Sequence, residues 1–221
     1  PKKVLAEEFT GVSCPPCPKG HKVMRSINTQ LNDRMVIIAY HKFDYPQTEP
    51  LQEPHKSHYD FRTEDASEAA NNIFGGLPGM PYAGFDRVAV GGALLINTLG
   101  WSNAATTRAA EASPVNIHIT SVYDATTKEA TIKVKLAYTQ TVNLTQNLTL
   151  AITEDSIVDR QKDQDDTGMP LVLDEYDHEH VLRDVVTPVS GTQIPDKVNP
   201  KVAGRVYERT FKVKLKDEWK P

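Results

Sequence analysis

The sequence predicts an α/β domain in residues 1–113, followed by an all-β antiparallel sandwich domain in residues 114–221. In the first part, short apolar runs alternate with segments of helical spacing. From Pro114 onward, apolar residues stand at alternate positions, which is typical of strands with one wet face. Domains average about 100 to 150 residues, so two compact units also fit the length of the chain.

The first domain begins with a strand, a helix and a second strand. Residues 3–10 form the apolar run of a buried strand, and residues 18–31 place apolar side chains at helical spacing. Residues 35–40 are again apolar, as in a parallel strand that is covered on both faces. Together these segments predict a βαβ unit with a right-handed crossover.

The rest of the first domain is less regular. Residues 41–58 hold three prolines without periodicity and predict a long surface excursion. A helix over residues 59–74 follows, and glycines and prolines break it at residues 75–81. We then expect a strand and the start of a hairpin over residues 82–90, turned near Asp86-Arg87. An alanine-rich helix over residues 101–112 closes the domain.

The second domain is predicted from apolar alternation alone. Its strands are expected over residues 115–119, 132–138, 142–152, 181–186 and 207–215. Short strands that are joined by turns, with no helix between them, predict an antiparallel sandwich of the immunoglobulin-like kind.

Composition and charge exclude two classes of protein. The chain is 39% hydrophobic and 24% charged, and no apolar stretch approaches the ~20 residues needed to span a bilayer, so we expect no transmembrane segment. The net charge of −4, without a basic stripe, argues against a nucleic-acid partner. Because Pro1 stands almost inside a strand, we expect that a secretory signal or lipid anchor upstream could have been removed.

The two cysteines of the chain stand as Cys14-Pro15-Pro16-Cys17, between the first strand and the first helix. This spacing cannot make a disulfide framework, and the second CxxC pair of a common zinc site is lacking. The N–H groups at a helix start lower the pKa of a cysteine thiol placed there, which favours thiol–disulfide chemistry. A structural disulfide or an inert pair is the alternative interpretation.

With these residues in view, the segment 3–112 resembles a thioredoxin fold, with Met80-Pro81 at the place of that family's cis-proline. Residues 3–18 and the run His178-Glu179-His180-Val181-Leu182-Arg183 also resemble the 28-kilodalton outer-membrane protein family of the Bacteroides group. Those proteins are exported and join a thioredoxin-like domain to a C-terminal β domain. The resemblance implies a periplasmic or outer-membrane-associated location in the bacterial envelope, and we expect no cofactor.

The thioredoxin resemblance implies roles for three residues. Cys14 would be the exposed attacking thiolate, and Cys17 the more buried resolving thiol. Glu8 matches the buried acid beneath the resolving cysteine, where burial would raise its pKa and let it accept a proton from Cys17. The alternative is that Glu8 faces outward at the end of its strand and the adjacent Glu7 is the buried residue.

Met80 and Pro81 are the expected substrate-binding residues. If their peptide bond is cis, Pro81 would lie against the Cys14 sulfur, and the backbone of Met80 could pair with an extended substrate strand. A plain turn proline is the alternative, with Pro78 as a rival for the special bond.

His178 and His180 are two residues apart and would project from one face of a strand, where they could hold zinc or copper. We favour ordinary strand histidines and expect no metal.

The sequence thus predicts an exported thiol–disulfide oxidoreductase that acts on protein disulfides together with an unidentified redox partner. The Pro-Pro dipeptide resembles that of TlpA-like reductants of the bacterial envelope, which favours reduction or isomerisation. The alternative is an outer-membrane-associated binding or adhesion protein, in which the thioredoxin-like half is a scaffold without turnover.

Overall fold

The computed structural model describes residues 1–165, 167–195 and 201–219. Contacts divide the chain into two compact units: Pro1–Glu111 with Ala151–Val185, and Ala112–Leu150 with Val186–Pro221. The elements of the first unit are β1 (Val4–Phe9), α1 (Cys17–Gln30), β2 (Met35–Tyr40), η1 (Pro46–Thr48), α2 (Glu64–Glu68), η2 (Ala69–Ile73), β3 (Tyr82–Phe85), β4 (Ile96–Asn97), α3 (Thr98–Ala110), β8 (Ala151–Glu154), β9 (Ile157–Gln164), β10 (Pro170–His178) and β11 (Val181–Val185). Those of the second unit are β5 (Val115–Asp124), β6 (Glu129–Tyr138), β7 (Asn147–Leu148), β12 (Thr192–Gln193) and β13 (Val206–Lys214).

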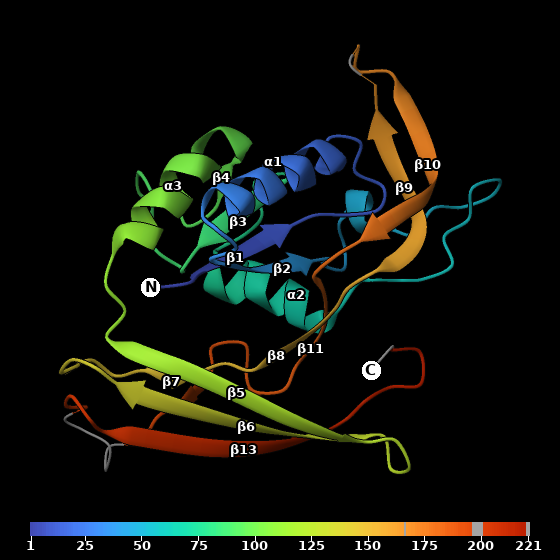
Figure 1. Ribbon diagram of the computed structural model, residues 1–221. Coiled ribbons are helices and arrows are strands. Elements are labelled where there is room, and N and C mark those ends of the chain that lie inside the picture. The colour runs from blue at the N-terminus through green and yellow to red at the C-terminus, as the bar shows by residue number, and fades with distance from the viewer. Residues whose placement is uncertain (166, 196–200, 220–221) are drawn as a thin grey trace. The chain divides into compact units, whose positions relative to one another are not determined.

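The first unit is built on a six-stranded mixed sheet in the order β4-β3-β1-β2-β11-β8. The strands β1 and β2 are parallel and joined through α1, as the predicted βαβ unit requires, while β3 runs antiparallel to β1. On the far side, β11 joins β2 in parallel and β8 runs antiparallel to β11. The helices α1 and α3 cover one face of the sheet and α2 the other (Figure 1).

The core of the first unit lies between the sheet and the two helices α1 and α3. Met24 and Ile27 of α1 pack there with Trp101 of α3 and the inward residues of β1 and β3. Trp101 has no exposed surface, and its indole N–H donates to the carbonyl of Ile96 at 2.9 Å. The polar end of this large side chain is therefore satisfied inside the core.

Residues 151–185 return to the first unit, which the expected division at residue 113 did not include. We placed residues 181–186 in the β domain, but β11 pairs with β2, and the N–H of Ala39 donates to the carbonyl of His180 at 2.8 Å. The outer edge of β2 presents backbone groups that need partners, and β11 supplies them. Apolar alternation identifies a strand without identifying the sheet that it joins.

Two boundaries in the first unit differ from the sequence analysis. The helix that we expected over residues 59–74 is only α2 followed by the π-helical turn η2. The strand that begins at Tyr82 ends at Phe85 and turns at Asp86 and Arg87, as expected, where these two residues adopt positive φ angles of 52° and 53°. The last helix begins three residues early at Thr98, where the side chain of Asn97 caps it by accepting from the N–H of Leu99.

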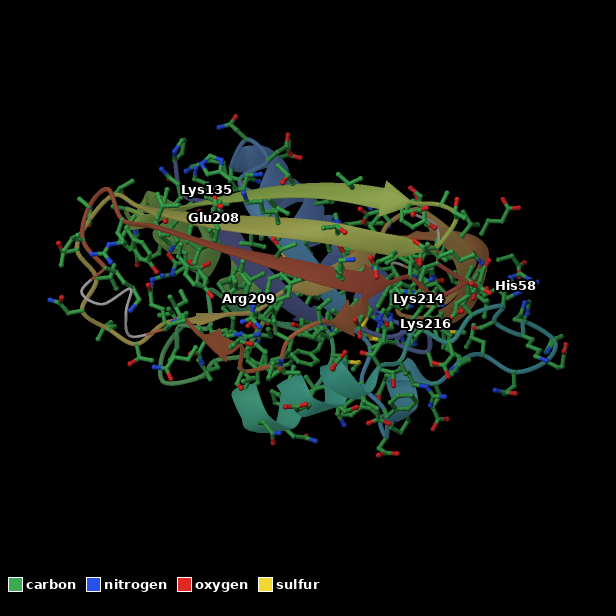
Figure 2. The ribbon with its side chains drawn as sticks, turned by 90° about the horizontal axis from the view of Figure 1, so that it is seen from below. His58, Lys135, Glu208, Arg209, Lys214 and Lys216 are labelled. Carbon is green, nitrogen blue, oxygen red and sulfur yellow. A yellow bond between two sulfur atoms is a disulfide. The ribbon has the colours of Figure 1, made fainter. Side chains whose placement is uncertain are left out.

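The second unit contains a three-stranded antiparallel sheet, β13-β6-β5, and a two-stranded ribbon of β12 and β7. The predicted alternation is present in β6, where Ile132, Val134 and Leu136 are buried. Charged side chains lie between these buried positions. Lys135 of β6 and Glu208 of β13, for example, are directly opposite each other on neighbouring strands (Figure 2). The antiparallel sheets are as expected, while their arrangement as an immunoglobulin-like sandwich stays a prediction.

Candidate functional site

The turn between β1 and α1 carries a disulfide between Cys14 and Cys17. Cys17 is the first residue of α1, and its N–H donates to the carbonyl of Cys14 at 3.2 Å. Pro15 and Pro16 stand between them, at the start of the helix, where backbone N–H groups have no intrahelical partners. The missing N–H groups of the two prolines therefore cost the helix no hydrogen bond, and the pair is held in a CxxC turn of the thioredoxin-like kind.

Both cysteines are fully buried, so the exposed Cys14 that we expected is contradicted. The strand β9 lies along the turn that carries the disulfide. The side-chain amide of Gln161 donates to the carbonyls of Gly11 at 3.1 Å and Cys14 at 3.3 Å, and the N–H of Lys162 donates to the carbonyl of Val12 at 2.8 Å. We call these contacts of Gln161 and Lys162 with the turn the cover. The sequence analysis places β9 in the second domain and therefore does not predict it.

Glu7 and Glu8 are both buried, and they differ in their partners. Glu7 receives the guanidinium of Arg87 at 2.8 Å and the hydroxyl of Tyr40 at 2.9 Å. Glu8 is 2% exposed, its Oε1 accepts no hydrogen bond from the described residues, and burial raises its pKa to about 8. Glu8 is therefore a protonated acid at neutral pH, whereas the charge of Glu7 is neutralised by a cation.

Pro81 packs against α1 close to Glu8. The Met80–Pro81 peptide bond is cis, and Pro81 precedes β3 directly. A Cβ atom placed on Gly20 would lie 2.8 Å from Cγ of Pro81 and 3.3 Å from Oε1 of Glu8. Glu8, Pro81 and the first turns of α1 thus meet at Gly20, one helical turn beyond Cys17. Contact between Pro81 and the Cys14 sulfur, and pairing of Met80 with substrate, stay predictions.

This close approach makes Gly20 a sensitive position. Gly20→Ala should lower the free energy of unfolding by about 1–2 kcal/mol, because overpacking against Pro81 outweighs the gain in helix propensity. Gly100→Ala in α3 is the matched control, since its Cβ would meet only the flexible end of Ile96, at 3.0 Å. Urea denaturation of both variants checks this. Equal stability changes would show that the approach of Pro81 is not tight.

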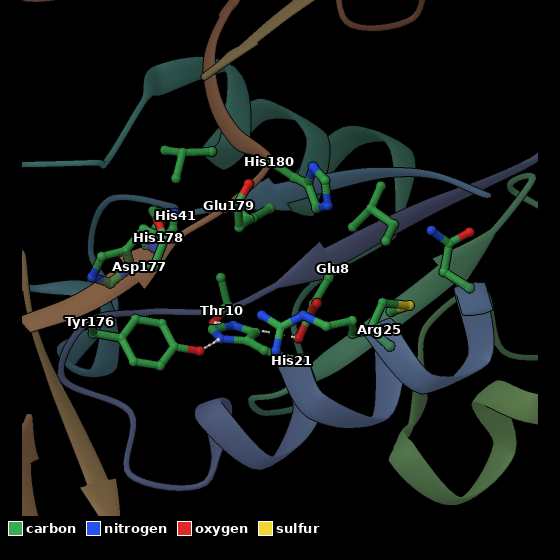
Figure 3. A pocket seen from close by; sticks show the side chains of 15 residues that line it. Glu8, Thr10, His21, Arg25, His41, Tyr176, Asp177, His178, Glu179 and His180 are labelled. Carbon is green, nitrogen blue, oxygen red and sulfur yellow. Dashed lines mark hydrogen bonds and ion pairs between the residues drawn. The ribbon is translucent and has the colours of Figure 1, made fainter. Parts of the chain in front are cut away.

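A cavity of about 540 Å³ opens beside α1 and reaches Glu8. Its walls come from β1, α1, β2, the end of β10 and the turn before β11 (Figure 3). Apolar side chains such as Met24 and Ile37 form part of the lining, and Arg25 and Asn28 add polar groups from α1. The buried carboxyl of Glu8 thus borders a cavity that is lined by both apolar and polar side chains.

Histidines gather on the wall of this cavity. His41 and His178 are 2% and 3% exposed, and Nδ1 of His41 and Nε2 of His178 have no hydrogen-bond partner among the described residues. Burial lowers the pKa of His178 to about 4. It also lowers the pKa of His41 and the pKa of His21. These neutral imidazoles come from the residue after β2, from β10 and from α1, and only the fold brings them together.

His178 and His180 do not share one strand face, in contrast to the sequence expectation. The strand β10 ends at His178, and His180 stands in the following turn with a φ of 60°. His180 instead pairs through Nδ1 with Asp155 at 3.0 Å. Among the described residues, Asp155, Glu179 and His180 form a group whose ligand atoms lie within 4.8 Å of one another, which is close enough to hold a cation.

Comparison with known proteins gives a family and a fold. Residues 67–221, well over half of the chain, match the family described as outer membrane protein Omp28, and the matched part begins after the CxxC turn. HBP35 of Porphyromonas gingivalis aligns with a TM-score of 0.63 and 17% identity, over 97% of this chain and 64% of that one. The chain therefore spans just under two thirds of the HBP35 structure.

A crystal structure of a protein from Agrobacterium tumefaciens also aligns, with a TM-score of 0.53 and 15% identity, over 95% of this chain and 78% of that one. At such identities the two structures speak for the fold alone. No curated protein matches the sequence. Within the part of the chain that the structure describes, no helix has the length and apolar character needed to cross a bilayer.

Proposed function

Since the chain belongs to the Omp28 outer membrane protein family, which suggests a bacterial-envelope location, we propose that it is an exported thiol–disulfide oxidoreductase acting on protein disulfides. The observation that carries the proposal is the Cys14–Cys17 disulfide at the start of α1, with the buried, protonated Glu8 of β1 next to Gly20, one helical turn after Cys17. A disulfide needed only for stability has no use for a costly buried acid in this position.

The reaction follows from these positions. In the reduced protein the Cys14 thiolate attacks a substrate disulfide, so that a mixed disulfide forms and one substrate thiolate leaves. Once the buried Glu8 has lost its proton, the thiol of Cys17 gives its own proton to the Glu8 carboxylate and attacks the Cys14 sulfur, which releases the second substrate thiolate. The protein is left oxidised, as in the structure, and a dithiol of the redox partner restores it. The Pro-Pro dipeptide favours the reductive or isomerising direction by analogy.

The cover on the disulfide has a place in this scheme. Because Cys14 has no exposed surface, a substrate reaches it only when the contacts of Gln161 and Lys162 with the turn are broken. These are neutral hydrogen bonds, each with a net value of about 1 kcal/mol, so a substrate strand that replaces them can displace β9. Met80, at the start of β3, would then offer its backbone to the same strand.

A binding or adhesion protein without turnover is the second candidate function. It is favoured by the burial of both cysteines and by β5, where Ile117 is 59% exposed and Ile119 60% exposed. Exposed apolar side chains along a ten-residue strand are typical of surfaces that meet a partner. In this case the thioredoxin-like unit would be a scaffold.

One pair of variants separates the two functions. Wild-type protein should accelerate the reduction of insulin by dithiothreitol, and Cys14→Ser should abolish the acceleration, because no mixed disulfide can form. Cys17→Ser should accumulate mixed disulfides with client proteins, since nothing resolves them. Insulin precipitation and non-reducing electrophoresis are the measurements. Wild-type activity equal to that of Cys14→Ser would leave the binding function, and equal trapping by both variants would void the assigned roles.

A further inference from the structure

We propose that His21 relays protons between Glu8 and the cavity, through a chain of hydrogen-bonding groups that ends at the hydroxyl of Tyr176. The inference rests on the proposed function and adds the route by which a proton exchanged with Cys17 reaches solvent. His21 would act through Glu8 and is therefore a positioning residue, without contact to substrate.

The imidazole of His21 bridges β1 and β10 (Figure 3). It lies on α1, four residues after Cys17 and so one helical turn along the same face. Its Nδ1 is 2.6 Å from the hydroxyl of Tyr176, and its Nε2 is 2.7 Å from Oγ1 of Thr10 and 3.7 Å from Oε1 of Glu8. One ring nitrogen thus faces the buried acid and the other faces the cavity wall.

The unpartnered oxygen of Glu8 is the second geometric support. A buried carboxyl oxygen without a hydrogen bond costs about 1–3 kcal/mol, so such atoms are rare unless they serve a purpose. Among the described residues, His21 is the basic side chain that approaches Oε1 of Glu8, with Nε2 at 3.7 Å. Contacts that transfer protons are often long before substrate binds, so a separation of 3.7 Å in the resting protein is compatible with transfer.

The surroundings of His21 keep its ring neutral. Burial lowers its pKa to about 3, and the nearby bases, His178, Arg25 and His180, act in the same direction. A neutral imidazole accepts a proton at one nitrogen while it donates from the other, so it can pass protons without holding charge. The titratable groups that face it are Glu8 from β1, Arg25 from α1, His41 just after β2, Tyr176 and His178 from β10, and His180 from the next turn.

The relay step is balanced in protons and involves no electrons. Outward, the carboxyl proton of Glu8 passes to Nε2 of His21 while the Nδ1 proton passes to the oxygen of Tyr176, whose own hydroxyl proton passes to solvent. One proton enters the ring and one leaves it, which converts the imidazole to its other tautomer. Inward transfer reverses each move. After the Cys17 proton has refilled the emptied Glu8, the ring regains its first tautomer by giving up its Nε2 proton and taking one at Nδ1 from solvent through the cavity.

The relay is tested with the chromogenic disulfide of nitrothiobenzoate, which reports two separate events on reduced protein. The first release of coloured thiolate measures attack by Cys14, and the second measures resolution by Cys17. His21→Ala and Tyr176→Phe should each slow the second release about tenfold and leave the first unchanged. This is less than the roughly 10²–10⁴-fold effect of a group that transfers a proton directly to the reacting atoms, because both residues act through Glu8. His55→Ala and Tyr59→Phe are matched controls on a partly exposed loop, and neither should change the second release.

Rescue separates a relay from a merely structural role. Added imidazole should restore the second release of His21→Ala, because the cavity leads to the vacated position, and it should not affect Tyr176→Phe to the same extent. An unchanged second release in His21→Ala, or a slowed release that imidazole does not restore, overturns the relay. Activity on insulin tests the proposed function independently: a protein inactive on insulin can still show the imidazole-dependent second release, and an active one can lack it. Absence of both releases would overturn both.

Discussion

Glu8→Gln should raise the free energy of unfolding at pH 7 by about 3 kcal/mol and remove the fall in stability that Glu8 contributes between about pH 5 and 8. The cause is the burial that raises the pKa of Glu8 from 4.5 to about 8. In the unfolded chain the carboxyl ionises near its ordinary pKa, while in the folded protein it stays protonated.

The sign follows from this difference. Below pH 4.5 the carboxyl is protonated in both states and its full contribution to stability is present. As the pH rises toward 8, only the unfolded state loses its proton, so stability falls until the folded-state pKa is passed. Glutamine is neutral throughout and lacks this loss. Stability curves at several pH values, from urea denaturation, give the measurement.

Glu7→Gln is the matched control at the neighbouring position. It should destabilise the protein, because the guanidinium of Arg87 would lose the carboxylate that it contacts at 2.8 Å. The two substitutions should thus change the free energy of unfolding in opposite directions. This distinguishes a specific effect of Glu8 from a general effect of removing negative charge. Parallel pH curves for Glu8→Gln and wild type would contradict the raised pKa.

Gln161→Ala should speed the reduction of the Cys14–Cys17 disulfide by dithiothreitol about tenfold. The Gln161 side chain is 1% exposed and donates to two carbonyls of the turn that carries the disulfide. Loss of two neutral hydrogen bonds makes opening of the cover easier by about 1–3 kcal/mol, and a factor of ten corresponds to about 1.4 kcal/mol. The measurement is the rate of thiol appearance under native conditions.

Gln164→Ala, on the same strand β9, provides the control, because its side chain is only partly buried and makes none of the contacts with the turn. If Gln164→Ala speeds reduction equally, general weakening of the hairpin explains the effect. If Gln161→Ala reduces no faster than wild type, access to Cys14 is limited by another part of the unit.

Local patterns in the sequence predicted the parts of the site that are close in the chain. The apolar run of β1, the helical spacing of α1 and the two prolines between the cysteines locate the CxxC turn, because each depends on neighbours only. They could not decide which of Glu7 and Glu8 lacks a counter-ion. That depends on Arg87, some eighty positions away along the chain, which approaches Glu7 through the β3 turn.

The cover and the cavity could not be predicted, since both depend on where residues 151–185 pack. Alternation in β9 predicts which face of the strand is buried. It cannot predict that this face contacts the turn of Gly11 to Cys14, because the turn lies far away in the sequence. The same holds for His21 and Tyr176, whose contact joins α1 to β10 across most of the chain. An exposed Cys14 is therefore the expectation for a domain that lacks residues 151–185.

The return of residues 151–185 also fixes the order in which the molecule can be completed. The chain passes between the units at three places, near residues 111, 150 and 185. During synthesis from the N-terminus, β2 emerges long before β11, so its edge and the unfinished cavity stay open until Val181 and Tyr176 have been made. Until β9 has been made, the CxxC turn also lacks the contacts that this strand supplies. The nascent chain is therefore the form in which the two cysteines are most accessible to oxidation, to mispairing and to partners that the finished fold excludes.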